Sequence, residues 1–253
     1  MKNQTIKQLQ NRTSIREFTG DSVSDDDLEL IFKTAQRAPT SINAQQISLI
    51  YTRDKEKIKY IAELCGGQPQ VATAEVFVFI VIDFNRTNYA AIAEGKTQVV
   101  EKCAEGIIVG AVDAGIMLSS LQSAAEALGY GTTAIGAIRG NSDKIVELLG
   151  LPARTFAAVG TTIGVPSQKA KSAPLKPRVP FESFAMEDIY ENEKVKKGAY
   201  SYNEEFKAFR DKTGSGSLPS YFETTSGFYE KSYYRKTATV LEAQGFRFSD
   251  SID

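Results

Sequence analysis

Apolar and polar residues follow two different periods along this chain, and the periods predict where strands and helices lie. Short apolar runs bounded by polar or turn residues predict strands at residues 47–51, 76–82, 132–138 and 156–163. Apolar residues spaced three and four positions apart predict helices at residues 3–11, 24–37, 55–64, 99–128 and 141–149. Helices interleaved with at least four strands indicate a layered α/β or α+β domain.

The longest predicted helix, residues 99–128, is mostly apolar and contains several glycines and alanines. These small residues allow close contact between helices, so we interpret the segment as a central core helix, which is also compatible with a dimer interface. Its most apolar part, Gly106–Leu118, is too short to span a bilayer and is interrupted by Asp113. We expect the Asp113 carboxylate to satisfy buried backbone groups or a helix partner, and we assign it no catalytic role.

Residues beyond Pro180 have a different pattern, because apolar periodicity weakens and aromatic residues recur between charged ones. Such a segment cannot easily form a core of its own. We therefore predict a main domain over residues 1–180 and a C-terminal extension over residues 181–253. The extension is expected to pack on the main domain or on a partner subunit.

The composition excludes several kinds of chemistry. The chain has no histidine, which removes Ser-His-Asp and Cys-His nucleophilic sites and HExxH zinc sites, and we expect no metal. Two cysteines do not form a disulfide scaffold and the N-terminus does not read as a signal segment, so a cytoplasmic location is expected. With 30 Lys and Arg against 31 Asp and Glu, the net charge of −1 favours neither nucleic acid nor a membrane surface as a partner. An organic cofactor is the expected source of chemistry.

Two short basic segments are candidate anion-binding groups. Arg12, Ser14 and Arg16 alternate in an extended segment, so their side chains share a face and could hold a phosphate. An edge strand with ordinary surface arginines explains the same spacing. Lys176 and Arg178 alternate around Pro177 and also share a side, although a solvated proline-rich linker is the commoner explanation.

Three turns between these segments offer polar groups or glycines that allow close approach of a ligand. They are residues 39–45, the Gly66-Gly67-Gln68 turn, and Ala134–Ala137 within a predicted strand. Each of them can also be an ordinary turn or packing feature. The chain has no GxGxxG or Walker A motif, so the sequence indicates neither a Rossmann nor a P-loop site.

The order of these motifs resembles the flavin-dependent nitroreductase family. The motifs are RxSIRxF at 12–18, TSxNxQ at 40–45, GGQ at 66–68, IGA at 135–137 and LKPR at 175–178. The likeness covers roughly residues 8–180 and is closest to the NADPH-linked nitroreductases and flavin reductases that carry a C-terminal extension. It implies an α+β layered sandwich, with a central mixed sheet flanked by helices, that forms an intertwined homodimer with FMN at the subunit interface.

The resemblance also assigns residues to the FMN site. They are Arg12, Thr13, Ser14, Arg16, Thr40, Ser41, Ile42, Asn43, Gln68, Ala134, Ile135, Gly136, Ala137, Lys176 and Arg178. Residues 40–43 are expected from the partner subunit, Gln68 is expected to hydrogen-bond the flavin, and residues 134–137 are expected to lie along its ring. The charge of Arg16 or Lys176 is expected to favour the anionic reduced flavin.

The implied activity is that of an FMN-dependent oxidoreductase reduced by NADPH or NADH. The reduced cofactor would then pass its electrons to small molecules such as nitroaromatics, quinones, azo compounds or free flavin. No protein acid or base is obligatory for this chemistry, which agrees with a chain that lacks histidine. The alternative is a non-catalytic flavin- or nucleotide-binding regulatory protein whose aromatic C-terminal segment blocks the nicotinamide.

Overall fold

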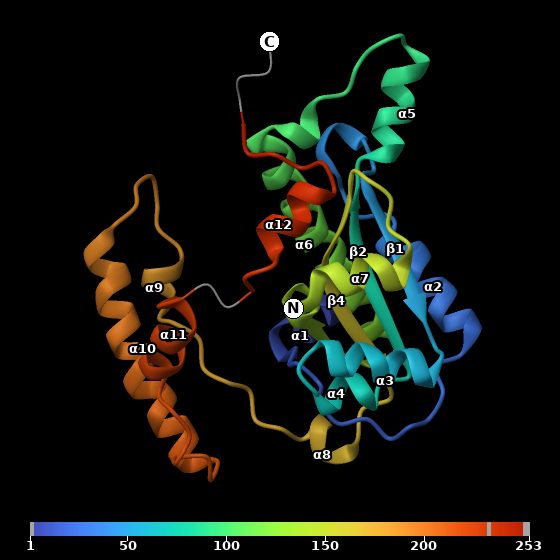
Figure 1. The fold of residues 1–253 in the computed structure, drawn as a ribbon. Coiled ribbons are helices and arrows are strands. Elements are labelled where there is room, and N and C mark those ends of the chain that lie inside the picture. The colour runs from blue at the N-terminus through green and yellow to red at the C-terminus, as the bar shows by residue number, and fades with distance from the viewer. Residues whose placement is uncertain (1–2, 232–233, 250–253) are drawn as a thin grey trace. The chain divides into compact units, whose positions relative to one another are not determined.

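A computed structural model describes residues 3–231 and 234–249, which divide into two compact units (Figure 1). The main unit contains residues up to Ser172 and the segment from Tyr234 onward, and the helical unit contains residues from Ala173. The elements, in chain order, are α1 (Gln4–Asn11), α2 (Asp25–Ala35), η1 (Ser41–Asn43), β1 (Ile47–Thr52), α3 (Lys55–Leu64), α4 (Pro69–Ala72), β2 (Val76–Asp83), α5 (Asn85–Ala93), η2 (Val100–Lys102), α6 (Ala104–Ala127), β3 (Gly131–Ile135), η3 (Gly136–Asn141), α7 (Ser142–Leu149), β4 (Thr155–Gly164), α8 (Gln168–Lys171), α9 (Phe181–Phe184), α10 (Asn192–Lys212), α11 (Tyr221–Tyr229) and α12 (Thr237–Ala243).

The main unit is built on one sheet whose strands lie in the order β1-β2-β4-β3. The α+β class predicted from the sequence is confirmed, but the prediction of a mixed sheet is wrong for the described residues, because each pairing among them is antiparallel. The end of β1 lies beside the start of β2, since Thr52 pairs with Phe77. Helices α3 and α4 therefore return the chain to the end of the sheet that it has just left, which makes the next strand antiparallel.

Helices cover both faces of the sheet and create two apolar cores (Figure 1). Every residue of β2 from Val76 to Ile82 is buried, and alternate side chains point to opposite faces. Val78 and Ile80 pack with α2 and α6, whereas Phe77 and Phe79 pack with α3, η3 and α7. The result is a sandwich of three layers with the sheet in the middle.

Several predicted boundaries are confirmed and others are corrected, among them the start of the longest helix, which lies at Ala104 and not at residue 99. Ser24 caps α2 by accepting a hydrogen bond from the Asp27 N–H, and α3 covers residues 55–64 as predicted. The third predicted strand, by contrast, ends at Ile135 instead of residue 138, and a 3-10 helix follows. Ile135 and Ile138 are both buried, and their spacing of three fits a 3-10 turn as well as it fits an apolar strand run.

The helical unit has a small aromatic core, which the sequence did not lead us to expect. The long helix α10 packs against α11, with ring centroids 4.9 Å apart for Tyr202 and Tyr221 and 5.0 Å apart for Tyr200 and Phe222. The final described segment instead belongs to the main unit. There Phe246 packs on Phe84, and a Gln244 side-chain N–H donates to the Pro152 carbonyl over 2.8 Å.

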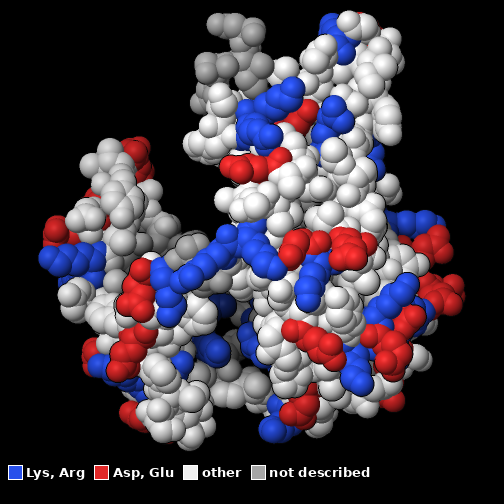
Figure 2. All heavy atoms as spheres, in the orientation of Figure 1, with Lys and Arg blue, Asp and Glu red and all other residues white. Residues whose placement is uncertain are grey.

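Helix α6 is, among the described residues, long and apolar enough to cross a membrane by length and composition. In the structure one face of it packs on the sheet and on α2, as the prediction of a core helix requires. The opposite face is exposed. Basic and acidic side chains are interspersed over the visible face of the main unit and do not separate by sign (Figure 2).

Both cysteines are free thiols. Cys65 is 4% exposed, and burial raises the pKa of its thiol to about 12. A thiol with that pKa stays protonated at neutral pH, and so it behaves as a small apolar core residue.

Candidate functional site

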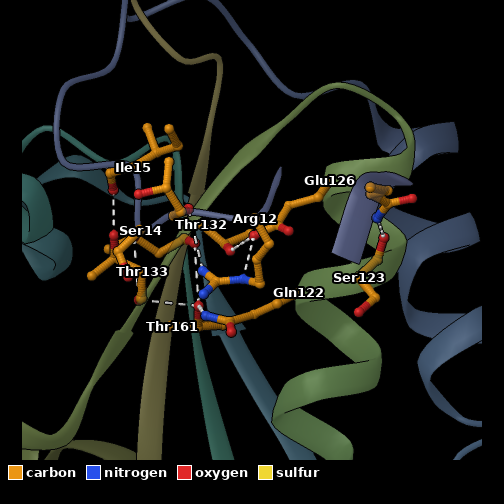
Figure 3. Close-up of polar contacts among 12 residues, drawn as sticks. Arg12, Ser14, Ile15, Gln122, Ser123, Glu126, Thr132, Thr133 and Thr161 are labelled. Atoms are coloured by element: carbon orange, nitrogen blue, oxygen red, sulfur yellow. Dashed lines mark hydrogen bonds and ion pairs between the residues drawn. The ribbon is translucent and has the colours of Figure 1, made fainter. Parts of the chain in front are cut away.

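The Arg12–Arg16 segment runs extended along the outer edge of β3 (Figure 3). The Ile15 N–H donates to the Thr132 carbonyl over 2.9 Å, and the Thr133 hydroxyl donates to the Ile15 carbonyl. The Ile15 side chain is buried against Gly131, where a methyl group would lie 2.6 Å from Ile15 Cγ2. The segment is thus fixed at its centre, and Ser14 and Arg16 alternate with the inward-facing Ile15.

The two arginines of this segment have different surroundings. Arg12 Nε lies 3.1 Å from Glu126 Oε1 near the end of α6, and the same oxygen accepts a hydrogen bond from the Thr132 hydroxyl over 2.8 Å (Figure 3). Arg16 is exposed and makes a long contact of 3.4 Å with the Ser14 carbonyl. Because Glu126 already neutralises Arg12, Arg16 is the better placed of the two to meet an anion.

The end of β3 turns into η3 at Gly136. The Ala134 side chain is exposed, whereas the Ile135 side chain belongs to the core, so only the backbone of Ile135 is available to a ligand. A methyl group on Gly136 would lie 3.0 Å from Nη2 of Arg139. This guanidinium, which the sequence interpretation missed because one arginine in a polar turn carries no distinctive spacing, also lies over the Tyr234 ring at 5.3 Å.

The Gly66-Gly67-Gln68 turn lies on the same side of the main unit as η3. The Asn141 side chain, at the end of η3, donates to the Leu64 carbonyl at the end of α3 over 2.8 Å. Gly66 and Gly67 have φ values of +79° and +73°, which other residues rarely adopt. Gln68 follows them and donates to the Cys65 carbonyl over 3.2 Å. The structure thus brings three of the predicted segments to the part of the main unit around β3.

Residues Thr40–Asn43 lie elsewhere. They precede β1, which forms the opposite edge of the sheet from β3. The Ser41 N–H donates to Asp113 on α6, with 3.2 Å to Oδ2. A hollow of about 440 Å³ beside them is lined by Arg37, Thr40, Asn43 and Arg86 among others. Within one chain, therefore, this segment and the Arg12–Arg16 segment do not come together.

Lys176 and Arg178 belong to the helical unit. They lie in a stretch without helix or strand, residues 173–180, as Pro177 and Pro180 predicted. The positive charge of Arg178 acts to lower the pKa of Tyr202, although burial raises that pKa more strongly. The meeting of these two bases with Arg16 stays a prediction.

The arrangement around β3 suits an anion with a flat ring. It offers an exposed guanidinium, backbone groups at glycines and an amide side chain. Groups of this kind can bind and orient a cofactor, but they do not supply a general acid or base. Among the described residues, no three His, Cys, Asp or Glu side chains gather in a way that could hold a metal ion.

Comparison with known proteins identifies the family. Residues 9–164 match the model of the nitroreductase family, and residues 176–249 match the C-terminal domain of that family. The chain belongs to the nitroreductase family. The resemblance inferred from the ordered motifs is confirmed.

Similar proteins are known over almost the full length of the chain. It is 37% identical to a Bacillus subtilis protein named FMN reductase (NAD(P)H), over 97% of this chain and 98% of that protein. The structure of B. megaterium NfrA2 superimposes with a TM-score of 0.94 at 37% identity, covering 98% of this chain and 100% of that one. The NADPH:FMN oxidoreductase of Vibrio harveyi, in complex with NAD+, has a TM-score of 0.84 at 27% identity, covering 96% and 98%.

The close packing of Ile15 on Gly131 yields a prediction. Gly131→Ala would place a methyl group 2.6 Å from Ile15 Cγ2 and force the Arg12–Arg16 segment away from β3. We expect this overpacking to lower the free energy of unfolding by about 1–3 kcal/mol, measured by urea denaturation. The control is Gly227→Ala in α11, where no atom lies within 4 Å of the added methyl group. Equal stability of the two variants would contradict the assigned packing.

Proposed function

We propose that this protein is an FMN-dependent oxidoreductase that takes hydride from NADPH or NADH and reduces small-molecule acceptors. The observation that carries the proposal is the exposed Arg16 guanidinium in a segment that pairs with β3, the strand that leads into the turn at Gly136. Family membership and a relative named FMN reductase (NAD(P)H) support it. Nitroaromatics, quinones, azo compounds and free flavin are the acceptor classes to test.

The residues present fit FMN. A phosphate needs cationic partners, and Arg16, Lys176 and Arg178 are exposed bases. A flat ring needs close approach to backbone, which the small, exposed side chain of Ala134 allows, while the Arg139 guanidinium takes the place that a side chain at Gly136 would need. Gln68 offers both a donor and an acceptor to the polar rim of the ring. Arg12, Thr13, Ser14, Ile135 and Ala137 complete this part of the proposed site.

When bound, FMN would accept hydride from the nicotinamide and pass it to the acceptor. The protein's role is then binding, orientation and charge. A fixed positive charge near the cofactor stabilises the negative charge that develops on reduction. We assign that role to Arg16 or Lys176. No proton transfer is assigned to a side chain, which suits a chain without histidine.

The proposed active form is a homodimer. Thr40, Ser41, Ile42 and Asn43 lie at the β1 edge, so in one chain they cannot join a site at the β3 edge, whereas a second copy could supply them. The outward face of α6 gives the copies a surface to share, since it exposes Ile108, Ala111, Val112 and Gly115 along one stripe. The free cysteines suit the reducing cytoplasm, which we propose as its location.

The absorbance spectrum tests this function directly. Purified protein supplied with FMN is expected to be yellow, and NADPH or NADH is expected to bleach it under nitrogen. Bound FMN that neither nicotinamide reduces would favour the alternative of a regulatory flavin-binding protein. A colourless protein that ignores added FMN would refute both.

The proposed phosphate-binding residues Arg16 and Lys176 give a second prediction. Arg16→Ala combined with Lys176→Ala is expected to weaken FMN binding by about 2–5 kcal/mol, which is roughly thirtyfold to several-thousandfold in Kd, because the phosphate loses charged partners. Fluorescence titration with FMN measures it. The control, Lys57→Ala with Lys59→Ala, also removes two positive charges, but from the exposed face of α3. Unchanged Kd in the first variant would refute the site assignment.

The homodimer gives a third prediction. Val112→Glu is expected to separate the subunits, because it places a charge in the apolar stripe of α6, where Val112 is 54% exposed in one chain. Sedimentation velocity measures the mass. The matched control is Leu30→Glu on α2, where Leu30 is 50% exposed and lies outside that stripe. A dimer that persists in Val112→Glu but not in Leu30→Glu would show that the interface lies elsewhere.

A further inference from the structure

Asp113 is a charged residue in the buried face of an apolar helix. Its side chain is 3% exposed, and burial raises the pKa of its carboxyl while the Ser41 N–H acts to lower it. Its Oδ2 accepts the Ser41 N–H over 3.2 Å and a Gln46 side-chain N–H over 2.6 Å. A buried carboxylate is costly unless it is hydrogen-bonded. Both of these donors belong to the stretch before β1.

The stretch that Asp113 holds is strained. Ile42, Asn43 and Gln45 have φ values of +48°, +57° and +54°. The left-handed region is especially unfavourable for a β-branched residue such as Ile42, and each such residue costs about 1–3 kcal/mol. Burial does not offset the cost at Ile42, because its side chain is 94% exposed. Two backbone hydrogen bonds close the 3-10 turn inside the stretch, from the Asn43 N–H to the Thr40 carbonyl over 3.0 Å and from the Ala44 N–H to the Ser41 carbonyl over 2.9 Å, and contacts from outside attach this turn to the rest of the unit.

Polar contacts at both ends of the stretch add to this turn. The Gln45 N–H donates to the Thr40 hydroxyl over 3.1 Å, and Arg86 donates to the Gln45 carbonyl. These contacts act on the end of the stretch. At the beginning of the stretch, the Asp113 carboxylate accepts a hydrogen bond from the backbone N–H of Ser41. Asp113 therefore connects a buried helix to an exposed loop that contributes nothing to the core of its own unit.

We propose that Asp113 is a positioning residue for cofactor binding, whose carboxylate fixes residues 40–45 in the conformation that they present to the flavin bound mainly by the other subunit. This inference rests on the proposed function. An exposed loop held in a strained conformation by a buried charge is expected where the shape of the loop itself is used. Asp113 would thus act through the loop and across the subunit boundary, without touching the flavin.

Asp113→Asn tests whether the Asp113 carboxylate fixes residues 40–45 for cofactor binding. The substitution keeps the shape but removes the charge, so the two hydrogen bonds that Oδ2 accepts lose their charge assistance. The new amide NH2 takes the place of Oδ1, where it opposes the Ser41 N–H at 3.4 Å. We expect the Kd for FMN, measured by fluorescence titration, to rise at least tenfold. The control is Asp83→Asn, since the Asp83 carboxylate likewise accepts one hydroxyl and one backbone N–H, from Ser48 and Asn85. Its Kd is expected to stay within twofold of wild type.

Exchanging the two polar groups provides a rescue. In Asp113→Asn with Gln46→Glu, the carboxylate moves to position 46, where it accepts from the new amide, while the amide oxygen at 113 still accepts the Ser41 N–H. We expect this variant to regain most of the lost FMN affinity, whereas Gln46→Glu alone, which opposes two carboxylates, does not. If Asp113→Asn does not fold, Gln46→Leu removes one donor and leaves Asp113 in place, with an expected rise in Kd of at least threefold.

Mixed dimers test the action across subunits. One subunit carries Asp113→Asn and the other carries Arg16→Ala, and differently tagged copies are co-purified. If Asp113 acts on the loop used by the other subunit's flavin, both defects fall in one site, and the other site binds one FMN per dimer with wild-type Kd. If both sites are weakened, Asp113 acts within its own subunit and the proposal is overturned.

The outcomes separate this inference from the proposed function. Wild-type protein that binds no FMN would refute the proposed function, and with it the positioning role of Asp113. If wild-type protein binds FMN tightly and Asp113→Asn has the same Kd, the positioning role of Asp113 is refuted and the proposed function is not. A loss in Asp113→Asn that the exchanged pair does not recover would also count against it, because general destabilisation then explains the loss.

Discussion

The hydrogen bonds made by α6 constrain the geometry of the whole main unit. This helix lies across the sheet, and it carries Asp113 toward one edge and Glu126 toward the other. Asp113 holds the stretch before β1, and Glu126 holds Arg12 and Thr132 beside β3. Thirteen residues separate the two carboxylates, which corresponds to about 20 Å of helix. Two of the candidate flavin-binding segments, the stretch before β1 and the Arg12–Arg16 segment, are thereby attached to the same helix at different places.

The rigidity of α6 between these two segments limits how a flavin site can be assembled. The Arg12–Arg16 segment and the stretch before β1 cannot approach one another by movement of a loop. The Ile15 contacts fix the first to β3, and the Asp113 contacts fix the second to α6. The proposed set of flavin ligands therefore needs two chains, with one of these two segments from each. The need for a dimer in this proposal arises from the position of the segments in the fold and not from weakness of the individual core.

The sequence predicted the sheet and most of the main-unit helices, because their apolar runs are long and their ends carry caps such as Ser24 and Gly129. It could not predict strand direction, since a helix between two strands is compatible with either direction, and the end of β3 was lost because Ile138 suits both strand and 3-10 turn. Helix α10 was missed because its aromatic residues pack on α11 and not on a continuous apolar face. Ordered motifs indicated candidate site segments, but they could not reveal that Asp113 holds residues 40–45 or that Arg139 lies against Gly136.

Neighbouring residues of α6 point in opposite directions at the place where assembly and cofactor binding meet. Val112 is exposed on the stripe proposed for dimer contact, whereas Asp113 is buried against the stretch before β1. A contact that fixes this turn of α6 also fixes the orientation of the carboxylate, since the two residues share one backbone. In the proposed homodimer the bound partner and the ordered loop therefore stabilise the same local conformation, and a ligand that binds only the assembled form favours that form by mass action. The proposal thus makes flavin binding and dimerisation linked equilibria.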